Sequence, residues 1–326
     1  MARGGASRAA KGKGIQGESS RARELEEEFD DAPLTERRRK SQASGEVDSE
    51  ALREKRQWVN RLASRNFKCE REVDENSLNG NEILQVLESN GLSQFRNKVD
   101  GYRPMLVIAF YENMLFQGNF IIDSTVYGTP IRITPDIIAF YLHYARPATE
   151  TITYPVPNWN KDLAYVIDAI TEDEDAYSEH FNRYTAGGLK ELYRLVNKIV
   201  SYNIHPYCRE KTPLKEDGDL IFAFGSGEEV VDWASLIFEE MCVFRAKGTT
   251  LGNIPFPAMI TKLCIKAGCK PKAVDRMVAG TLGPITLSSV KKSRSLSHGV
   301  DPEEGARARP TARGAIERND QWFKIM

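Results

Sequence analysis

The feature that most constrains the fold is the apolar stretch from Tyr102 to Tyr144. It predicts a first helix over residues 103–116, enclosed on most sides, because apolar side chains occupy nearly every position there. β-branched residues are then frequent on both sides of a turn, which predicts a hairpin over residues 119–133. A threonine followed by a proline predicts the start of a second helix, over residues 136–143. The stretch has the composition of a hydrophobic core, and its hairpin must pack on the two helices to be stable.

Helical spacing of apolar residues recurs through the middle of the chain. Residues 188–202 give the clearest amphipathic pattern, in which Asn197 and Lys198 are among the residues predicted to face water. The predicted fold class is mainly α: one helical domain over residues 49–283, with a small β-hairpin packed on it. The further helices expected span residues 51–65, 81–90, 161–170, 228–246, 257–268 and 272–279, with a short strand or turn at residues 220–224.

Two charged segments flank this domain. Residues 1–48 and 284–326 hold few apolar side chains, so little burial would offset the entropy lost on ordering their backbone. We expect both to be disordered arms, the first charged and the second basic. Their basic clusters are typical of a nucleic-acid contact or a nuclear-import signal, and the alternative is a solvated run of charge. The candidate residues are Arg37, Arg38, Arg39, Lys40, Lys291, Lys292 and Arg294.

The net charge and the cysteines bear on which partners and which cellular compartment the protein has. A formal net charge of −1 gives no overall attraction to nucleic acid, so we expect any such contact to be weak and to involve the arms. No apolar run approaches the roughly 18 residues needed to cross a bilayer, and no membrane partner is expected. Five scattered cysteines, with no secretory signal at the N-terminus, predict free thiols in an intracellular protein. Whether that protein is nuclear or cytoplasmic stays open.

The sequence contains no recognisable catalytic motif. None of its four histidines is paired with a serine or cysteine in a known pattern, and His143, in an apolar segment, is predicted to be a core residue. Catalytic groups converge in space rather than in sequence, so an enzyme is disfavoured without being excluded. One alternative is a metal-dependent nuclease of the transposase type. Asp123, Asp136 and Asp168 are available for it, but the strands that would carry them are not.

Three further patterns suggest ligand binding, and each has a simpler interpretation. His205 and Cys208 have the spacing of metal ligands, but structural zinc needs four ligands and no second pair follows. Residues 225–227 read Gly-Ser-Gly before a predicted helix, but Val230 stands where a dinucleotide site needs glycine. The acidic run 172–175 predicts a solvated loop, because consecutive carboxylates in a turn rarely converge on one ion. We therefore expect no cofactor and no metal.

Three segments follow the patterns of one known family. Ala109-Phe110-Tyr111 is similar to an EFY segment, and residues 133–141, ITPDIIAFY, are similar to the pattern FSPEAINxFY. Residues 256–268, FPAMITKLCIKAG, are close to FPxLITxLCxxAG. In these segments the chain resembles the putative plant transposon protein domain, whose members occur in and around Athila-type and related plant retrotransposons. Two departures are Ile133, which replaces the usual aromatic residue, and residues 245–254, which only loosely follow the INVG region.

The resemblance implies an origin in a mobile element and supplies no catalytic residues, because the family has no established reaction. A core without chemistry, basic arms and this resemblance together favour a non-enzymatic, retrotransposon-derived plant protein. Its helical domain would mediate protein–protein or assembly contacts, self-association included, while its basic arms would make weak nucleic-acid contact. Two alternatives stay open: a nucleic-acid-processing enzyme whose site is assembled only in three dimensions, and a host-recruited regulatory binding module.

Overall fold

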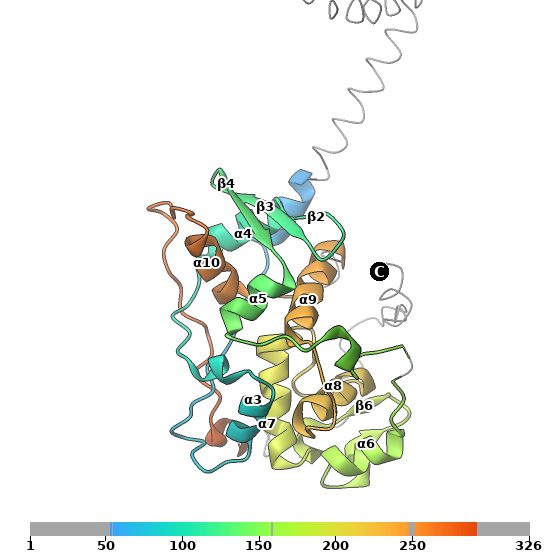
Figure 1. The fold of residues 1–326 in the computed structure, drawn as a ribbon. Coiled ribbons are helices and arrows are strands. Elements are labelled where there is room, and N and C mark those ends of the chain that lie inside the picture. Colours follow the sequence, from blue (N-terminus) through green and yellow to red (C-terminus); the bar gives the residue numbers. More distant parts are fainter. Residues whose placement is uncertain (1–52, 54, 158, 248–251, 292–326) are drawn as a thin grey trace, which may run out of the picture. The chain divides into compact units, whose positions relative to one another are not determined.

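The structure is a computed structural model that describes residues 53, 55–157, 159–247 and 252–291 (Figure 1). The chain divides into two units, residues 1–57 and 58–326, and the elements named below belong to the second unit. This unit is mainly helical and carries a few small sheets, which confirms the predicted fold class. Nothing in the described ranges is a helix with both the length and the apolar content needed to span a bilayer.

The predicted order of helix, hairpin and helix is confirmed. The hairpin turns at Tyr127 and Gly128, whose φ angles are both positive, 52° and 83°. Two such residues make the turn whose twist matches that of the strands it joins. Thr134 caps the next helix, because its hydroxyl oxygen accepts a hydrogen bond from the Ile137 N–H at 3.3 Å. The elements are α4 (Pro104–Glu112), β3 (Ile122–Val126), β4 (Thr129–Ile133) and α5 (Pro135–Leu142).

The helix α4 is shorter and less enclosed than predicted. It ends at Glu112, and the residues expected to continue it form β2 (Leu115–Phe116), an exposed strand that pairs with β3. The Asn113 side chain fixes this end, since it donates to the carbonyl oxygens of Ala109 and Thr125, both at 3.0 Å. These two hydrogen bonds attach the end of α4 to the hairpin, at the point where the helix was predicted to continue. Its buried residues are Leu106, Val107, Phe110 and Tyr111.

The prediction that His143 is a core residue is wrong, because its side chain is exposed. His143 follows α5 with a φ of 52°, in the left-handed region, and so ends the helix. The next residue, Tyr144, turns back, and its N–H donates to the Ala139 carbonyl oxygen at 2.9 Å. Apolar neighbours in the sequence therefore do not ensure that a residue just after the last turn of a helix is buried.

The helix α7 (Glu191–Ile199), which continues as a π-helical turn through Val200–Ile204, is more enclosed than predicted. Asn197 and Lys198 are buried and do not face water. The Asn197 amide donates to the Glu210 carbonyl oxygen at 2.8 Å, and Lys198 forms an ion pair with the Glu210 carboxylate. Polar groups can be buried when they are paired. The prediction that Asn197 and Lys198 face water was wrong because Glu210, in the segment after the helix, supplies their partners.

The prediction of a strand or turn at residues 220–224 is also wrong. These residues form the second half of α8 (Lys215–Gly225). The helix starts among polar residues, where the Asp217 carboxylate accepts the Leu214 N–H at 2.9 Å. The apolar run is thus only the buried end of a longer helix.

Residues 272–279, predicted as a helix, form instead a turn at residues 273–274 and then a non-helical segment at the start of α4. Val278 and Tyr102 exchange two backbone hydrogen bonds, of 2.9 and 2.8 Å. The buried Asp275 carboxylate accepts the N–H groups of Met105 and Leu106, at 3.2 and 3.1 Å, and so caps α4 from outside. Packing continues beyond residue 283, since Ile285 and Val290 are buried.

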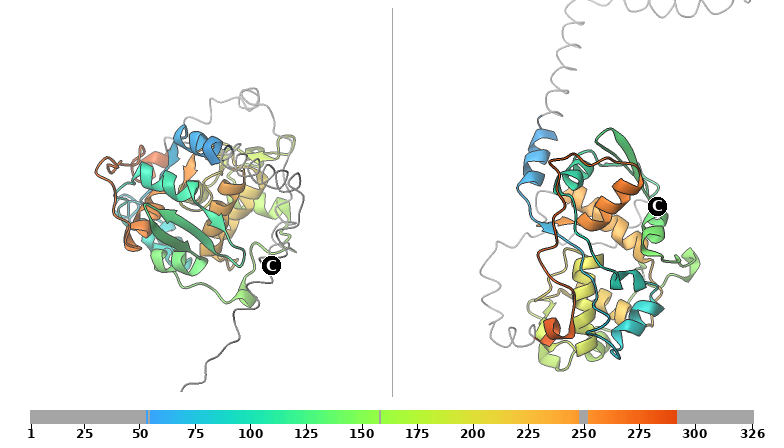
Figure 2. Two further views of the ribbon diagram at one scale, coloured as in Figure 1. Left: turned by 90° about the horizontal axis from the view of Figure 1, so that it is seen from above. Right: turned by 90° about the vertical axis from the view of Figure 1, so that its left-hand side faces the viewer.

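The helices of the second unit form two groups that share one long helix. Figures 1 and 2 show α4, α5 and α10 beside the hairpin at one end, and α3, α6, α7 and α8 at the other. The helix α9 contacts α5 in the first group and the π-helical turn after α7 in the second. The remaining elements are β1 (Phe67–Lys68), α3 (Ile83–Ser89), η1 (Ser93–Arg96), η2 (Thr149–Thr151), α6 (Leu163–Ile170), η3 (Glu174–Ala176), β5 (Tyr177–Ser178), β6 (Arg183–Tyr184), η4 (Ala186–Gly188), α9 (Trp233–Lys247), β7 (Ile254–Pro255) and α10 (Pro257–Lys266).

Candidate functional site

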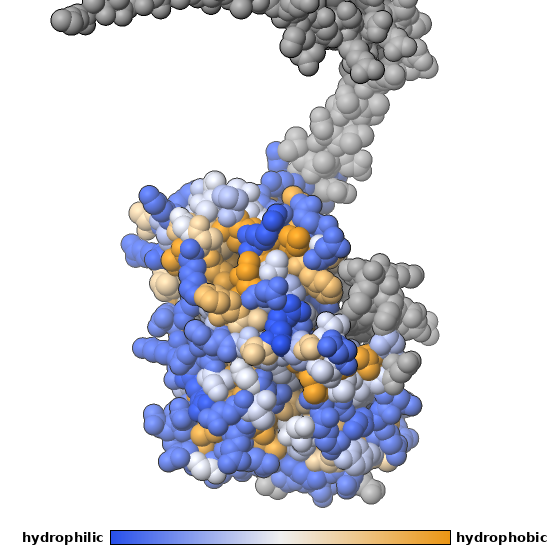
Figure 3. Space-filling model, viewed as in Figure 1, coloured by the Kyte–Doolittle hydropathy of each residue, from blue (hydrophilic) through white to orange (hydrophobic). Residues whose placement is uncertain are grey.

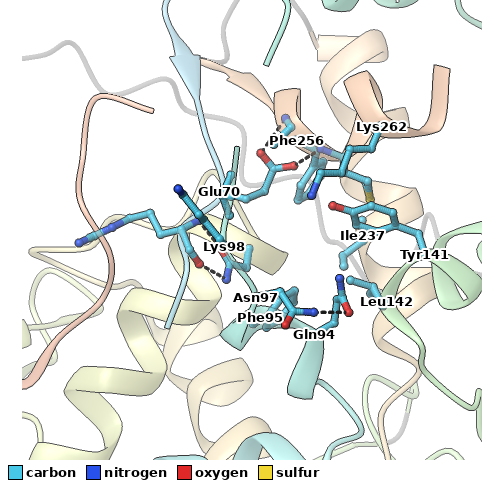
Figure 4. Close-up of a pocket in the computed structure, with 15 residues that line it drawn as sticks. Glu70, Gln94, Phe95, Asn97, Lys98, Tyr141, Leu142, Ile237, Phe256 and Lys262 are labelled. Atoms are coloured by element: carbon cyan, nitrogen blue, oxygen red, sulfur yellow. Dashed lines mark hydrogen bonds between the residues drawn. The ribbon is translucent and has the colours of Figure 1, made fainter. Parts of the chain in front are cut away.

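A pocket lies beside Glu70, which follows the strand β1 (Figure 4). The Glu70 carboxylate reaches the start of α10, where it accepts the N–H groups of Ala258 at 3.0 Å and Met259 at 2.8 Å. Lys262 and Tyr141 line the same pocket. Burial raises the pKa of Glu70 to about 7, although the two N–H donors act in the opposite direction. Glu70 is therefore a helix cap whose charge changes near neutral pH.

The volume of this pocket decides what it can hold. Its cavity measures about 40 Å³. Sites for cofactors and drug-sized ligands measure roughly 300–1,000 Å³, whereas a single water needs on the order of 10–15 Å³. The pocket as it stands is therefore sized for water between α10 and its neighbours.

A cluster of buried charges lies between α8 and α9. The His205 ring is held on both sides: its Nδ1 lies 2.7 Å from Glu240 Oε1, and its Nε2 lies 3.2 Å from Asp217 Oδ1. Burial by itself lowers the pKa of His205, but Glu240 and Asp217 outweigh it and raise that pKa to about 9. At neutral pH the ring is an imidazolium, with no free nitrogen to accept a proton.

Two neighbouring groups complete this cluster. Lys68 donates to the Pro206 carbonyl oxygen at 2.8 Å, which brings a second positive charge next to the His205 loop. Cys208 is buried, and burial raises the pKa of its thiol well above the usual range. A neutral, enclosed thiol is a poor nucleophile. The cluster thus joins β1, α8, α9 and the loop after α7 by charge, and its role is structural.

We expect this cluster to make stability depend on pH. The pKa of His205 is about 9 in the folded protein against 6.5 as an ordinary value, so its contribution is fully present below pH 6.5. It is lost as the pH rises through about 9, because the folded state then releases a proton that it had held more tightly than the unfolded state. The free energy of unfolding, measured by urea denaturation, should fall across this window.

The matched variants for this prediction are His205→Gln and His143→Gln. The first should flatten the pH dependence between 6.5 and about 9, whereas the second, at an exposed ring, should keep it. A His205→Gln curve with the slope of the unaltered protein would show that other groups cause the dependence.

An exposed apolar surface covers one side of the first helix group. Figure 3 shows apolar residues gathered over the part of the molecule where α5 and α10 lie. Phe140 on α5 is 72% exposed and Val274 is 73% exposed. The Lys266 ammonium lies 5.1 Å from the centroid of the Phe140 ring, which joins α10 to α5 at this surface. We call it the apolar face; the exposed large apolar residues on α4, α5, α10 and the segment after α10 are Met105, Phe140, Ile265, Val274, Met277, Val278 and Leu282.

The comparisons with known proteins give one match. The family model described as "Putative plant retrotransposon-related domain" matches residues 88–270, more than half of the chain. The chain belongs to this family. No curated protein and no solved structure matches the chain significantly.

The segments that carried the family resemblance have structural roles in this retrotransposon-related domain. Phe256 is buried with a φ of 51°, and Pro257 after it starts α10. The Thr261 hydroxyl donates to the Pro257 carbonyl oxygen at 2.8 Å and accepts the Arg103 N–H at 3.0 Å, so it links α10 to the start of α4. Gly268, with a φ of 94°, follows the end of α10.

One of the basic residues predicted as a nucleic-acid or nuclear-import site is among the described residues. Lys291 is exposed, in a helical turn over residues 287–291. Outside the described residues lie Arg37, Arg38, Arg39, Lys40, Lys292 and Arg294.

The three carboxylates considered for a nuclease lie on β3, α5 and α6. Asp123 pairs with Arg132 at 2.8 Å, and Asp136 pairs with Arg146 at 2.5 Å. Asp168 is exposed on α6. Over the described part of the chain, no three His, Cys, Asp or Glu residues are placed to hold a metal ion. All five cysteines are free thiols.

Sequence reasoning missed the groups that matter most in the interior: Glu70, Asp217, Glu240 and Asp275. Glu70, Glu240 and Asp275 have partners far away in the sequence, so no local spacing marks them. One signal was available for Asp217, which stands three residues after Leu214 at a helix start, where a carboxylate caps the first turn. The acidic run 172–175 is also not wholly solvated, since Glu172 pairs with the buried Arg194 at 3.1 Å.

Proposed function

We propose that this retrotransposon-derived protein is non-enzymatic and that its helical domain makes assembly contacts between copies of the chain. The observation that carries the proposal is the apolar face. Soluble monomers rarely expose large contiguous apolar surfaces, and such surfaces commonly mark protein–protein contacts. In support, the residues of the apolar face lie on α4, α5, α10 and the segment after α10, which caps the start of α4 from outside.

The charges around Phe140 favour a second copy as the partner. Asp136 lies one helical turn before Phe140 on α5, with its carboxylate 80% exposed, and Lys266 lies against the ring. A two-fold contact requires each surface to be complementary to itself. Opposite charges close to one exposed aromatic ring are compatible with this requirement, with Asp136 of one copy facing Lys266 of the other.

Weak nucleic-acid contact through the basic segments is a second part of the proposal. Its candidate residues remain Arg37, Arg38, Arg39, Lys40, Lys291, Lys292 and Arg294. Lysine and arginine clusters attract phosphates without regard to base sequence, and that attraction falls steeply with salt.

Sedimentation velocity of the full chain over a wide concentration range tests the assembly contact. We expect a monomer–dimer equilibrium, and the double variant Phe140→Asp/Val274→Asp should weaken it at least about tenfold, because it buries charge in an apolar contact. The control Leu115→Asp/Val230→Asp makes the same change at exposed apolar residues outside the apolar face and should associate like the unaltered chain. Monomers at every concentration, or equal effects of the two variants, would refute the assembly contact.

A further inference from the structure

Two arginines lie against one pair of aromatic rings, outside the predicted basic arms, and the charge of a third acts on both. The rings of Trp58 and Phe244 lie 5.9 Å apart between centroids. The Arg245 guanidinium lies 4.9 Å from the Trp58 centroid, and the Arg65 guanidinium lies 5.8 Å from the Phe244 centroid. Arg61 stands between Trp58 and Arg65 at helical spacing. We call Arg61, Arg65 and Arg245 the arginine cluster.

The arginine cluster has no carboxylate to balance Arg61 or Arg245 in the described part of the chain. Arg245 donates to the Met114 carbonyl oxygen, at 3.3 Å. Among the described residues, the Nε of Arg61 is buried without a hydrogen-bond partner. Arg96, Arg132, Arg146 and Arg194 differ from Arg61 and Arg245 in this respect, since each of the four has a carboxylate partner.

The like charges act on one another. Burial lowers the pKa of Arg245, and the charge of Arg61 lowers it further. Burial is likewise the main cause of the lowered pKa of Arg65, and Arg61 again adds to it. A bound anion would relieve this repulsion. The guanidinium group is suited to phosphate, because its N–H groups form a fixed fork that can bond two oxygens at once.

We propose that the arginine cluster binds the backbone phosphates of a nucleic acid. The cluster presents three guanidinium groups from two separate segments of the chain, residues 61–65 and residue 245, which suits successive phosphates of a nucleic acid better than a single phosphate. Trp58 and Phe244 are buried, so they position the arginines and leave no ring on which a base could stack. The contact is therefore with phosphate and independent of base sequence. This site stands whether or not the apolar face joins two copies.

The test is fluorescence anisotropy of labelled single-stranded RNA and duplex DNA with the full chain, across a salt series. The double variant Arg61→Gln/Arg245→Gln should lose at least about tenfold in affinity at low salt. Its salt dependence should fall by the equivalent of about one to two phosphate contacts. The matched control is Arg132→Gln/Arg183→Gln, which removes the same charge elsewhere and should change affinity less than about twofold. Arg61→Lys/Arg245→Lys should bind more tightly than the glutamine double variant but less tightly than the unaltered chain, because lysine keeps the positive charge and lacks the planar guanidinium group.

Two further experiments distinguish the possible sources of nucleic-acid binding. Glutamine at residues 37–40 removes the basic arm alone, so a loss confined to that variant would assign binding to the arm and overturn the proposal. Inorganic phosphate at constant ionic strength should not displace the oligonucleotide; full displacement would show a site for free phosphate instead. If the double variant fails to fold, arginine modification by phenylglyoxal on the unaltered chain replaces it: the oligonucleotide should protect Arg61 and Arg245, and equal labelling with and without it would refute the site.

Discussion

Replacing Asp217 by alanine is expected to lower the free energy of unfolding by about 3–5 kcal/mol, because breaking a buried ion pair leaves its partner charge uncompensated. Asp217 is 2% exposed and lies 3.2 Å from the buried His205 ring. It also accepts the Leu214 N–H at the start of α8, so the substitution removes a helix cap as well. Urea denaturation of the full chain at neutral pH measures the effect.

Asp168→Ala is the matched control, since it removes the same carboxylate from an exposed helical position on α6. Surface substitutions of this kind usually change stability by less than about 0.5 kcal/mol. Similar losses in the two variants would mean that the cluster around His205 contributes no more than an exposed charge.

Replacing Tyr111 by alanine should cost a similar amount, about 3–5 kcal/mol, through loss of packing. Tyr111 is fully buried, and its ring lies 4.7 Å from that of Phe244 and 5.2 Å from that of Phe110. Its hydroxyl donates to the Pro255 carbonyl oxygen at 3.1 Å, which links α4 to the strand before α10. Chemical denaturation again gives the measurement.

Tyr111→Phe separates the contribution of the ring to stability from that of the hydroxyl group. It keeps the ring contacts and removes one hydrogen bond, so we expect a loss of about 1 kcal/mol. A phenylalanine variant as unstable as the alanine variant would place the stabilisation in the hydrogen bond and contradict the packing explanation.

The sequence predicted the elements that are made by neighbouring residues. Pro104, Pro135 and Pro257 start helices, and Tyr127 with Gly128 makes the hairpin turn. These features depend on local backbone geometry, which a few residues determine. The family resemblance was likewise carried by such local segments and is confirmed by the match.

The errors arose where tertiary contacts override local pattern. Asn197 and Lys198 are buried because Glu210 supplies partners that no spacing reveals. Residues 272–279 could form a helix by themselves, but Asp275 is drawn to the start of α4. The cluster around His205 has the same origin, since Asp217 and Glu240 come from different helices. None of these pairings follows from propensity or period.

The remote caps of α4 and α10 show that the folded unit extends beyond the residues that match the family. The family match runs from residue 88 to residue 270, but Glu70 precedes it and Asp275 follows it. Trp58, whose indole N–H donates to the Tyr111 carbonyl oxygen at 3.1 Å, also lies before the match. A gene fragment copied at the borders of the match would leave both helix starts without their carboxylates. We therefore expect residues 88–270 alone to be less stable than residues 58–291, which include both caps.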